Sequence, residues 1–355
     1  MEKRFMKGCE AIAEAAVRGG CRFFAGYPIT PQNEIPEYLS WRLPEVGGAF
    51  VQGESEVASI NMVYGAAATG KRALTSSSGP GISLKAEGIS YLASAQLPAV
   101  IVNISRGGPG LGSIQPAQSD YLQATKALGH GGFRAMVFAP ATLQEAVDLT
   151  YNAWDYAERY RNPVMILMDG CLGAIMEEVE LPEMKETTFE NTEEWCLARV
   201  GGRTDSHMIT PILPEPALEL LNKGKAMQYK MWEMLDTKVE EFMLEDAEYV
   251  VVAYGIAARV AKEAILRLRE EGYKVGMVRP ITLYPFPKAS LDNLDYSLVK
   301  GVIDIEMTIP AQMREDIELQ VKGRCPVHEY GRSGGMLLDD EGVYDAIAEI
   351  VKGGE

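Results

Sequence analysis

The fold is decided by the stretch Val51-Gln52-Gly53-Glu54-Ser55-Glu56-Val57-Ala58-Ser59-Ile60-Asn61-Met62-Val63-Tyr64-Gly65. Residues 49–52 predict a short strand that ends at Gly53, and Ser55 predicts the N-cap of the helix that follows. Helical spacing places four apolar residues on one face of this helix, namely Val57, Ile60, Tyr64 and Ala67. A strand that leads directly into a helix is the repeating unit of open α/β sheets, which bind ligands at the carboxyl ends of their strands.

Glu56 is the one acidic residue in the first turn of this otherwise apolar helix. A helix N-terminus stabilises a carboxylate at that position. A lone acidic residue in a first turn is more commonly an exposed side chain in solvent. A functional interpretation of Glu56 therefore depends on what other segments bring to the same edge of the sheet.

Two other segments follow buried strands in the same way. Gly26-Tyr27-Pro28-Ile29-Thr30-Pro31 follows residues 21–25, and Asn103-Ile104-Ser105-Arg106-Gly107-Gly108 follows residues 98–102. Together with Ser55-Glu56-Val57-Ala58, these motifs resemble, in the same order, the pyrimidine-binding part of the 2-oxoacid:ferredoxin oxidoreductases, which use thiamine diphosphate. The resemblance extends through the C-terminal third of the chain.

Strands that alternate with helices predict an α/β fold with a parallel sheet covered on both faces. By the resemblance, residues 1–185 form a thiamine diphosphate pyrimidine-binding domain and residues 246–355 form an α/β domain like the transketolase C-terminal domain. Residues 186–245 are expected to be a helical linker, in which Leu218 to Leu244 form one long charged helix.

Composition excludes several classes of protein. The chain has 355 residues and a net charge of −16, so an acidic surface would repel nucleic acid. It contains no run of about 18 or more apolar residues, so we expect no membrane span, and its first residues lack the apolar core of a signal peptide. The five scattered cysteines predict a reducing, cytoplasmic location.

The cysteine and histidine spacing also limits metal chemistry. No Cys-x-x-Cys occurs and the three histidines are far apart, so we expect neither an iron–sulfur cluster nor a zinc site in this chain. If the reaction passes electrons to an iron–sulfur cluster, another subunit carries it.

The signature for the diphosphate of this cofactor is Gly-Asp-Gly followed by an asparagine. Met168-Asp169-Gly170 lacks the first glycine and is interpreted as a strand end. The glycine-rich turns at residues 76–81 and 107–112 are not followed by Lys-Ser or Lys-Thr, so neither is a phosphate loop, and a plain tight turn remains open for both. The magnesium and diphosphate site is therefore expected on a partner subunit.

The resemblance implies specific roles for side chains near this edge. Glu56 would be catalytic, because it would hydrogen-bond the pyrimidine ring nitrogen and promote deprotonation of the thiazolium. The other residues expected to bind the cofactor are Tyr27, Pro28, Ile29, Ser78 and Gly79.

Thr30 and Arg106 would hold the carboxylate of the substrate. Considered separately, Arg106 also fits an ordinary loop arginine, and Thr30 also fits a helix cap. One departure stands out, since the family often has Gly-Asn-Glu-Ala where this chain has Gly8-Cys9-Glu10-Ala11.

The activity implied is CoA-dependent oxidative decarboxylation of a 2-oxoacid to acyl-CoA and CO2, with ferredoxin as electron acceptor. The implied partners are a thiamine diphosphate- and magnesium-binding subunit, an iron–sulfur subunit and a gamma-type subunit. Residues 107–125 contain no lysine or arginine for a second substrate carboxylate, and they look closer to the branched-chain (2-oxoisovalerate) branch of the family than to the 2-oxoglutarate branch.

Three alternatives remain open at this point. The chain could be a 2-oxoglutarate:ferredoxin oxidoreductase subunit, or a subunit of a non-oxidative thiamine-dependent decarboxylase. From another class, it could be a non-catalytic module that binds nucleotides or anions on the same fold.

Overall fold

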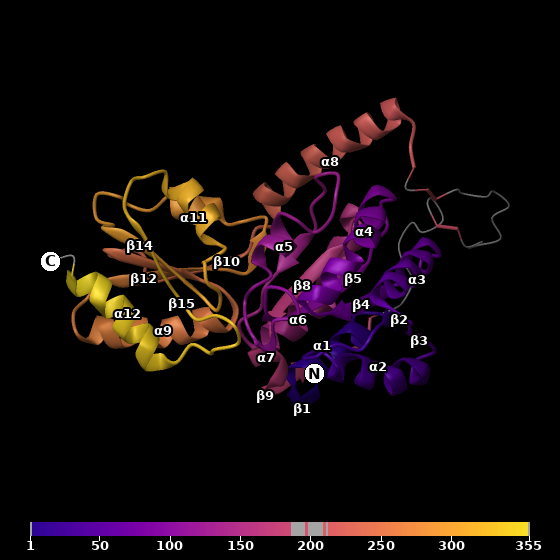
Figure 1. Ribbon diagram of the computed structural model, residues 1–355, viewed down its shortest axis with the longest axis horizontal. Helices are drawn as coiled ribbons and strands as arrows, with labels where there is room; N and C mark the ends of the chain where they lie inside the picture. Colours follow the sequence, from indigo (N-terminus) through magenta and orange to yellow (C-terminus); the bar gives the residue numbers. More distant parts are fainter. Residues whose placement is uncertain (1, 186–195, 198–208, 211, 354–355) are drawn as a thin grey trace.

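The computed structural model describes residues 2–185, 196–197, 209–210 and 212–353. Two α/β units lie side by side, with the N-terminal unit in indigo and magenta and the C-terminal unit in orange and yellow (Figure 1). The α/β fold with parallel sheets is confirmed. Part of the expected linker (186–195, 198–208 and residue 211) lies outside the described residues.

The first unit is built on one large sheet with strand order β13-β7-β8-β5-β4-β2-β3. Pairs from β7 to β3 in this order are parallel, whereas β13 pairs with β7 and β6 pairs with β5 in antiparallel fashion. The strands of this unit are β1 (Glu2–Lys7), β2 (Phe23–Gly26), β3 (Ala49–Gln52), β4 (Ala73–Ser77), β5 (Val100–Gly107), β6 (Ser113–Pro116), β7 (Met136–Phe138), β8 (Val164–Asp169) and β9 (Met176–Leu181). Its helices are α1 (Gly8–Arg18), α2 (Glu34–Glu45), α3 (Glu56–Ala68), α4 (Gly79–Ser94), α5 (Tyr121–Thr125), α6 (Leu143–Tyr160) and α7 (Gly170–Ala174).

Helices cover both faces of this sheet, which explains why its central strands are buried throughout and mostly apolar before their carboxyl ends. All residues of β4, β5 and β8 are buried. In β5, Val100 and Val102 pack into the core formed with α1, α2 and α6, whereas Ile101 packs into the core formed with α3 and α4. A strand with two buried faces reads as a continuous apolar run in the sequence.

Helix α3 begins as expected, and its buried face includes Ile60 and Ala67 as expected but is rotated toward Glu56. Ser55 is its N-cap, and the Ser55 hydroxyl accepts a hydrogen bond from Ala58 N at 3.1 Å. Ile60 is buried as expected, but Val57 is 45% exposed. The buried face starts at Glu56 instead, because α3 packs against α4 through the side that carries this carboxylate.

The second unit has a sheet of order β10-β12-β11-β14-β15, parallel except for β10. Its strands are β10 (Val239–Phe242), β11 (Tyr249–Ala253), β12 (Val275–Pro280), β14 (Gly301–Glu306) and β15 (Val327–Gly331), while β13 (Thr282–Tyr284) joins the first sheet. Its helices are α9 (Gly255–Glu270), α10 (Lys288–Asp292), α11 (Arg314–Val321) and α12 (Asp340–Gly353). Because β13 extends the first sheet, the two units share backbone hydrogen bonds.

The single long helix expected for Leu218 to Leu244 is wrong. Helix α8 (Glu215–Leu235) ends before Asp236, and β10 then pairs with β12. The edge of the second sheet decides the conformation of residues 239–242, and helical propensity alone did not reveal this edge. The division at residues 185 and 245 stays a prediction, with β10 assigned to the second sheet.

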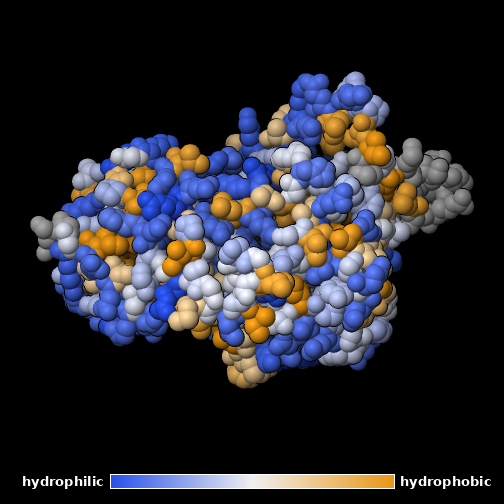
Figure 2. Space-filling view, viewed as in Figure 1, coloured by the Kyte–Doolittle hydropathy of each residue, from blue (hydrophilic) through white to orange (hydrophobic). Residues whose placement is uncertain are grey.

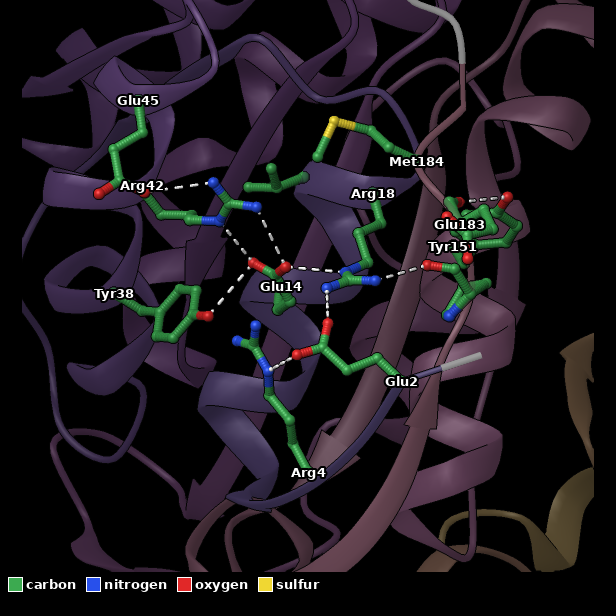
Figure 3. A network of polar contacts seen from close by, with 12 residues as sticks. Glu2, Arg4, Glu14, Arg18, Tyr38, Arg42, Glu45, Tyr151, Glu183 and Met184 are labelled. Atoms are coloured by element: carbon green, nitrogen blue, oxygen red, sulfur yellow. Dashed lines mark hydrogen bonds and ion pairs between the residues drawn. The ribbon is translucent and has the colours of Figure 1, made fainter.

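A buried carboxylate ties α1 to α2 (Figure 3). Glu14 is fully buried and accepts hydrogen bonds from Arg18 Nε at 2.8 Å and from Arg42 Nε at 2.9 Å. Burial raises the pKa of Glu14, but the hydrogen bonds from Arg42 and Arg18 outweigh burial and hold its pKa below the ordinary value.

Exposed apolar residues on the face in Figure 2 occur as separate patches among hydrophilic side chains. Among the described residues, no helix combines the length and apolar character that a membrane crossing needs.

Candidate functional site

The carboxyl ends of β2, β3, β4 and β5 meet at one edge of the first sheet. Parallel register places Gly26 level with Gln52 and Ser77 level with Asn103. The segments that follow β2, β3 and β4 carry the expected site residues from Tyr27 to Gly79, and Arg106 lies near the end of β5 itself. The fold therefore brings the three motifs to one edge, as α/β sheets do with their ligand sites.

Glu56 lies buried at this edge, with 7% of its surface exposed. Its carboxylate faces the first turn of α4 so closely that a Cβ on Gly81 would come within 2.8 Å of Glu56 Oε1. The same Cβ would also collide with the Ser77 hydroxyl. Glycine at position 81 is thus what lets the Glu56 carboxylate approach the end of β4.

Several buried polar atoms near this carboxylate have no hydrogen-bond partner among the described residues. They are Ser77 Oγ, Ser78 Oγ, Asn103 Oδ1 and Arg106 Nε. Buried polar groups are almost always paired in folded proteins, so a cluster of unpaired ones needs an explanation. A polar ligand at the carboxyl ends of β4 and β5 would supply the missing partners.

Ser78 and Gly79 lie beside a buried acid that sequence reasoning missed. A Cβ on Gly79 would come within 3.2 Å of Asp120 Oδ1, and Asn103 Nδ2 donates to Asp120 Oδ2 at 3.1 Å. Burial raises the pKa of Asp120, and the hydrogen bond from Asn103 partly opposes this rise. The turn after β4 is therefore tied to the segment that follows β6.

Arg106 and Thr30 are in direct contact. Arg106 Nη1 donates to the main-chain oxygen of Thr30 at 2.9 Å, and Arg106 Nη2 donates to the main-chain oxygen of Leu111 at 3.1 Å. A guanidinium has five N–H donors, so three stay available to a ligand. Thr30 is exposed and is not a helix cap, because α2 begins at Glu34 with Asn33 as its N-cap.

Tyr27 and Pro28 line a hollow of about 260 Å³ at the ends of β2 and β3, and Glu56 is not part of its wall. Ile29 N donates to Asn33 Oδ1 at 3.0 Å, which fixes the loop that carries these residues. The fully buried Gln32 connects this loop to β4, because its amide donates to Tyr27 O and accepts a hydrogen bond from the Ser76 hydroxyl.

Cys9, at the position where the family often has asparagine, contacts the same loop. It is fully buried, and its thiol lies 3.8 Å from the main-chain oxygen of Pro31. Burial raises the pKa of the Cys9 thiol, so it stays protonated and acts as a small packing residue.

Asp169 links the two α/β units through hydrogen bonds. Its carboxylate accepts hydrogen bonds from Leu172 N at 3.0 Å and from Ile256 N at 3.1 Å, at the start of α7 and α9. Within the described ranges, no group of three or more His, Cys, Asp or Glu side chains is arranged to hold a metal.

Sequence reasoning also missed Lys85, which is fully buried in α4. Lys85 Nζ donates to Thr75 Oγ1 at 2.6 Å and to the main-chain oxygen of Ser76 at 2.9 Å. The signal was present in the sequence, because Lys85 shares one helix face with the buried Ile82 and Ile89. A lysine on the apolar face of a helix is uncommon unless it has a specific partner.

Two family models match the chain. The model described as "Pyruvate flavodoxin/ferredoxin oxidoreductase, thiamine diP-bdg" matches residues 14–237, and "Pyruvate:ferredoxin oxidoreductase core domain II" matches residues 247–343.

Curated relatives resemble the chain over nearly its whole length. The chain is 46% identical to the ketoisovalerate oxidoreductase subunit VorB of Methanothermobacter thermautotrophicus, over 99% of this chain and 98% of that protein. It is 34% identical to the 2-oxoglutarate synthase subunit KorA of Methanocaldococcus jannaschii, over 98% of this chain and all of that protein.

A solved 2-oxoglutarate:ferredoxin oxidoreductase from Magnetococcus marinus, with 2-oxoglutarate, coenzyme A and succinyl-CoA bound, superposes with a TM-score of 0.85 at 28% identity. The match covers 98% of this chain and 65% of that one. A solved structure described as "Split gene transketolase, inactive beta4 tetramer" superposes with a TM-score of 0.60 at 16% identity. At this identity the likeness supports only the fold.

Proposed function

Because the chain belongs to the pyruvate flavodoxin/ferredoxin oxidoreductase family, we propose that it is the pyrimidine-binding subunit of a 2-oxoacid:ferredoxin oxidoreductase. The reaction is CoA-dependent oxidative decarboxylation, with 2-oxoisovalerate as the preferred substrate. The observation that carries this proposal is the buried Glu56 carboxylate, set against Gly81 and beside unpaired hydroxyls at the end of β4.

The residues at this edge fit the ring of thiamine diphosphate. When bound, this cofactor supplies the electron sink that decarboxylation of a 2-oxoacid requires. Glu56, which is buried, would hydrogen-bond the pyrimidine ring nitrogen, and Ser78 and Gly79 would border the ring. The hydroxyls of Ser77 and Ser78 offer partners for its polar atoms.

The loop that carries Tyr27, Pro28 and Ile29 closes the same site from the β2 side. Gln32 and Asn33 hold this loop in place through the hydrogen bonds described above. The magnesium and diphosphate site is assigned to the partner subunit, because Asp169 is engaged with Leu172 and Ile256. We therefore expect the isolated chain to bind thiamine diphosphate weakly and to contain no iron when pure, which calorimetry and iron analysis would test.

Arg106 orients the substrate. Its remaining N–H donors bind the 2-oxoacid carboxylate, while its contact with the main-chain oxygen of Thr30 holds the Thr30 loop against the substrate. The guanidinium therefore positions the keto carbon without entering the chemical step.

The preference for a branched apolar substrate rests on the loop after β5. Leu111 and Ile114 are 79% and 57% exposed, and Arg106 is hydrogen-bonded to the backbone of Leu111. These side chains are available to an apolar substrate tail. The higher identity to ketoisovalerate oxidoreductase subunits than to 2-oxoglutarate synthase subunits supports the same choice.

The experiment uses the assembled complex with a ferredoxin or viologen acceptor. Glu56→Gln is expected to abolish acyl-CoA formation, while Glu54→Gln, at an exposed neighbouring position, keeps it. Wild-type activity in the Glu56 variant would refute the assignment. A higher kcat/KM for 2-oxoglutarate than for 2-oxoisovalerate would move the chain to the other branch, and CO2 release without acceptor reduction would favour a non-oxidative decarboxylase.

Partner subunits need a surface, and α8 offers one. Leu220, Met227, Met231 and Met234 recur along one side of this helix and are 47–80% exposed. Large exposed apolar residues that line up on one helix face are typical of protein interfaces. We assign this face to contact with a partner subunit, among the cofactor-diphosphate, iron–sulfur and gamma-type subunits that the proposed reaction needs.

The free thiols of Cys9, Cys21, Cys171 and Cys325 support a reducing compartment. We therefore propose that the enzyme works in the cytoplasm, which fits ferredoxin as its electron acceptor.

A further inference from the structure

Lys85 is a buried cation without a close counter-ion. Its side chain has no exposed surface, and it donates hydrogen bonds to two neutral oxygens, the Thr75 hydroxyl and the Ser76 carbonyl. The described ion pairs do not include Lys85. Burying an ammonium in this way is expensive, and an apolar side chain of similar length would fill the same space at lower cost.

The charged group that acts on Lys85 is Glu56. Burial lowers the pKa of Lys85 to about 7, and the Glu56 carboxylate opposes this by raising it. Of the elements packed around Lys85, α3 contributes this carboxylate, whereas β4 contributes only the hydroxyl and carbonyl groups named above.

The packing of α4 explains why the Lys85 ammonium and the Glu56 carboxylate interact. Lys85 follows Gly81 by one helical turn, and Glu56 Oε1 lies against Gly81. Both charges thus lie along the same side of α4, in an interior where electrostatic interactions are weakly screened.

We propose that Lys85 is a positioning residue for Glu56, whose buried ammonium attracts the Glu56 carboxylate and holds it against the first turn of α4, where it would bond the pyrimidine ring. This inference rests on the proposed role of Glu56, because a carboxylate with another task would not need this charge. The ammonium also reaches the Ser76 carbonyl, and Ser76 is bonded to Gln32 beneath the Tyr27 loop. Lys85 therefore supports both the Glu56 side of the site and the loop that carries Tyr27.

The first test measures the free energy of unfolding of the full chain for the wild type, Lys85→Met, Glu56→Gln and the double variant. At pH 6 the ammonium is charged, so the effects of the two single substitutions are expected not to add. At pH 9 the amine is neutral, so the effects are expected to add. Lys85→Gln, which keeps a donor without the charge, repeats the cycle if Lys85→Met does not fold.

The matched control is Lys225→Met. Lys225 is also buried, and burial lowers its pKa to about 8, but it lies on α8 and bonds to Asn162 Oδ1 at 2.9 Å. Its effect is expected to add to that of Glu56→Gln at both pH values. Additivity of Lys85→Met with Glu56→Gln at pH 6, or coupling that is equal at pH 6 and pH 9, would overturn the inference.

The second test follows kcat/KM against pH in the assembled complex. Lys85→Met is expected to lower kcat/KM more at pH 6, where the wild-type ammonium is charged, than at pH 9, where the wild-type amine is neutral. Equal losses at pH 6 and pH 9 would refute the positioning role. If Glu56→Gln is fully active, the proposed function fails, while the stability cycle still decides whether the two charges are coupled.

Discussion

The Arg106 guanidinium donates a hydrogen bond at 2.9 Å to the main-chain oxygen of Thr30, which lies 76 residues earlier in the chain. This bond joins the loop after β2 to the end of β5 at the edge where Glu56 is buried. Because Arg106 is itself 7% exposed, the contact is largely shielded from solvent.

Arg106→Met is expected to lower kcat/KM for a 2-oxoacid by about 10- to 100-fold, mainly through KM, since a charge-assisted bond contributes roughly 1.5–3 kcal/mol. Steady-state kinetics of the complex would measure this. Arg259→Gln, at an exposed arginine paired with Glu177, is the control and should leave both constants unchanged. An unaltered KM in the Arg106 variant would contradict a role in substrate binding.

Gly81→Ala is expected to abolish activity while the chain still folds. Its Cβ would come within 2.8 Å of Glu56 Oε1 and would collide with the Ser77 hydroxyl, so the carboxylate must move. Gly65→Ala in α3 is the matched control, because a Cβ there meets nothing within 4 Å. The control should stabilise the chain by about 0.5–1 kcal/mol. Full activity of Gly81→Ala would show that the position of the Glu56 carboxylate does not depend on a glycine at residue 81.

Glu14→Gln is expected to destabilise the chain by about 3–5 kcal/mol at pH 7, because it leaves the Arg18 and Arg42 guanidinium groups without their buried partner. The folded-state pKa of Glu14 is lowered, so its contribution is present above the unfolded value of 4.5 and is lost as the pH falls through the folded value. Urea unfolding between pH 3 and pH 7 should therefore show a steeper acid loss in the wild type than in the variant. Equal slopes would mean that the ion pair contributes nothing.

The contribution of Glu306 to stability depends on pH in the opposite direction to that of Glu14. Glu306 is fully buried next to Asp304 in β14, and burial raises its pKa to about 7. The pKa of Asp304 is raised even further above its ordinary value by burial and by Glu306, so Asp304 keeps its proton. Between the unfolded value of 4.5 and about 7 the folded state binds more protons, so stability falls as the pH rises through this window.

Glu306→Gln is expected to reduce this fall without abolishing it, since the glutamine keeps an acceptor for the hydrogen bond from Met313 N without a charge, while the buried Asp304 still contributes. Unfolding free energies at pH 5 and pH 8 would test it, with Glu349→Gln, at an exposed position of α12, as the control. A wild type that gains stability from pH 5 to pH 8, with no change in the variant, would contradict the buried-acid interpretation.

The sequence by itself determined the features that depend on near neighbours in the chain. Ser55 caps α3 because a cap needs only the next three residues, and the buried strands are visible as apolar runs because both of their faces are covered. The order of the three motifs predicted that they would meet at one sheet edge, since parallel strands end on the same side.

Only the tertiary structure decided which charged side chains are buried near one another. Lys85 meets the surroundings of Glu56 because α3 and α4 pack against each other, and this packing also turns Glu56 inward and leaves Val57 exposed. In the same way, residues 239–242 are a strand because the edge of the second sheet offers them hydrogen bonds. Burial, electrostatic coupling and sheet edges depend on residues far apart in the chain, so local periodicity does not encode them.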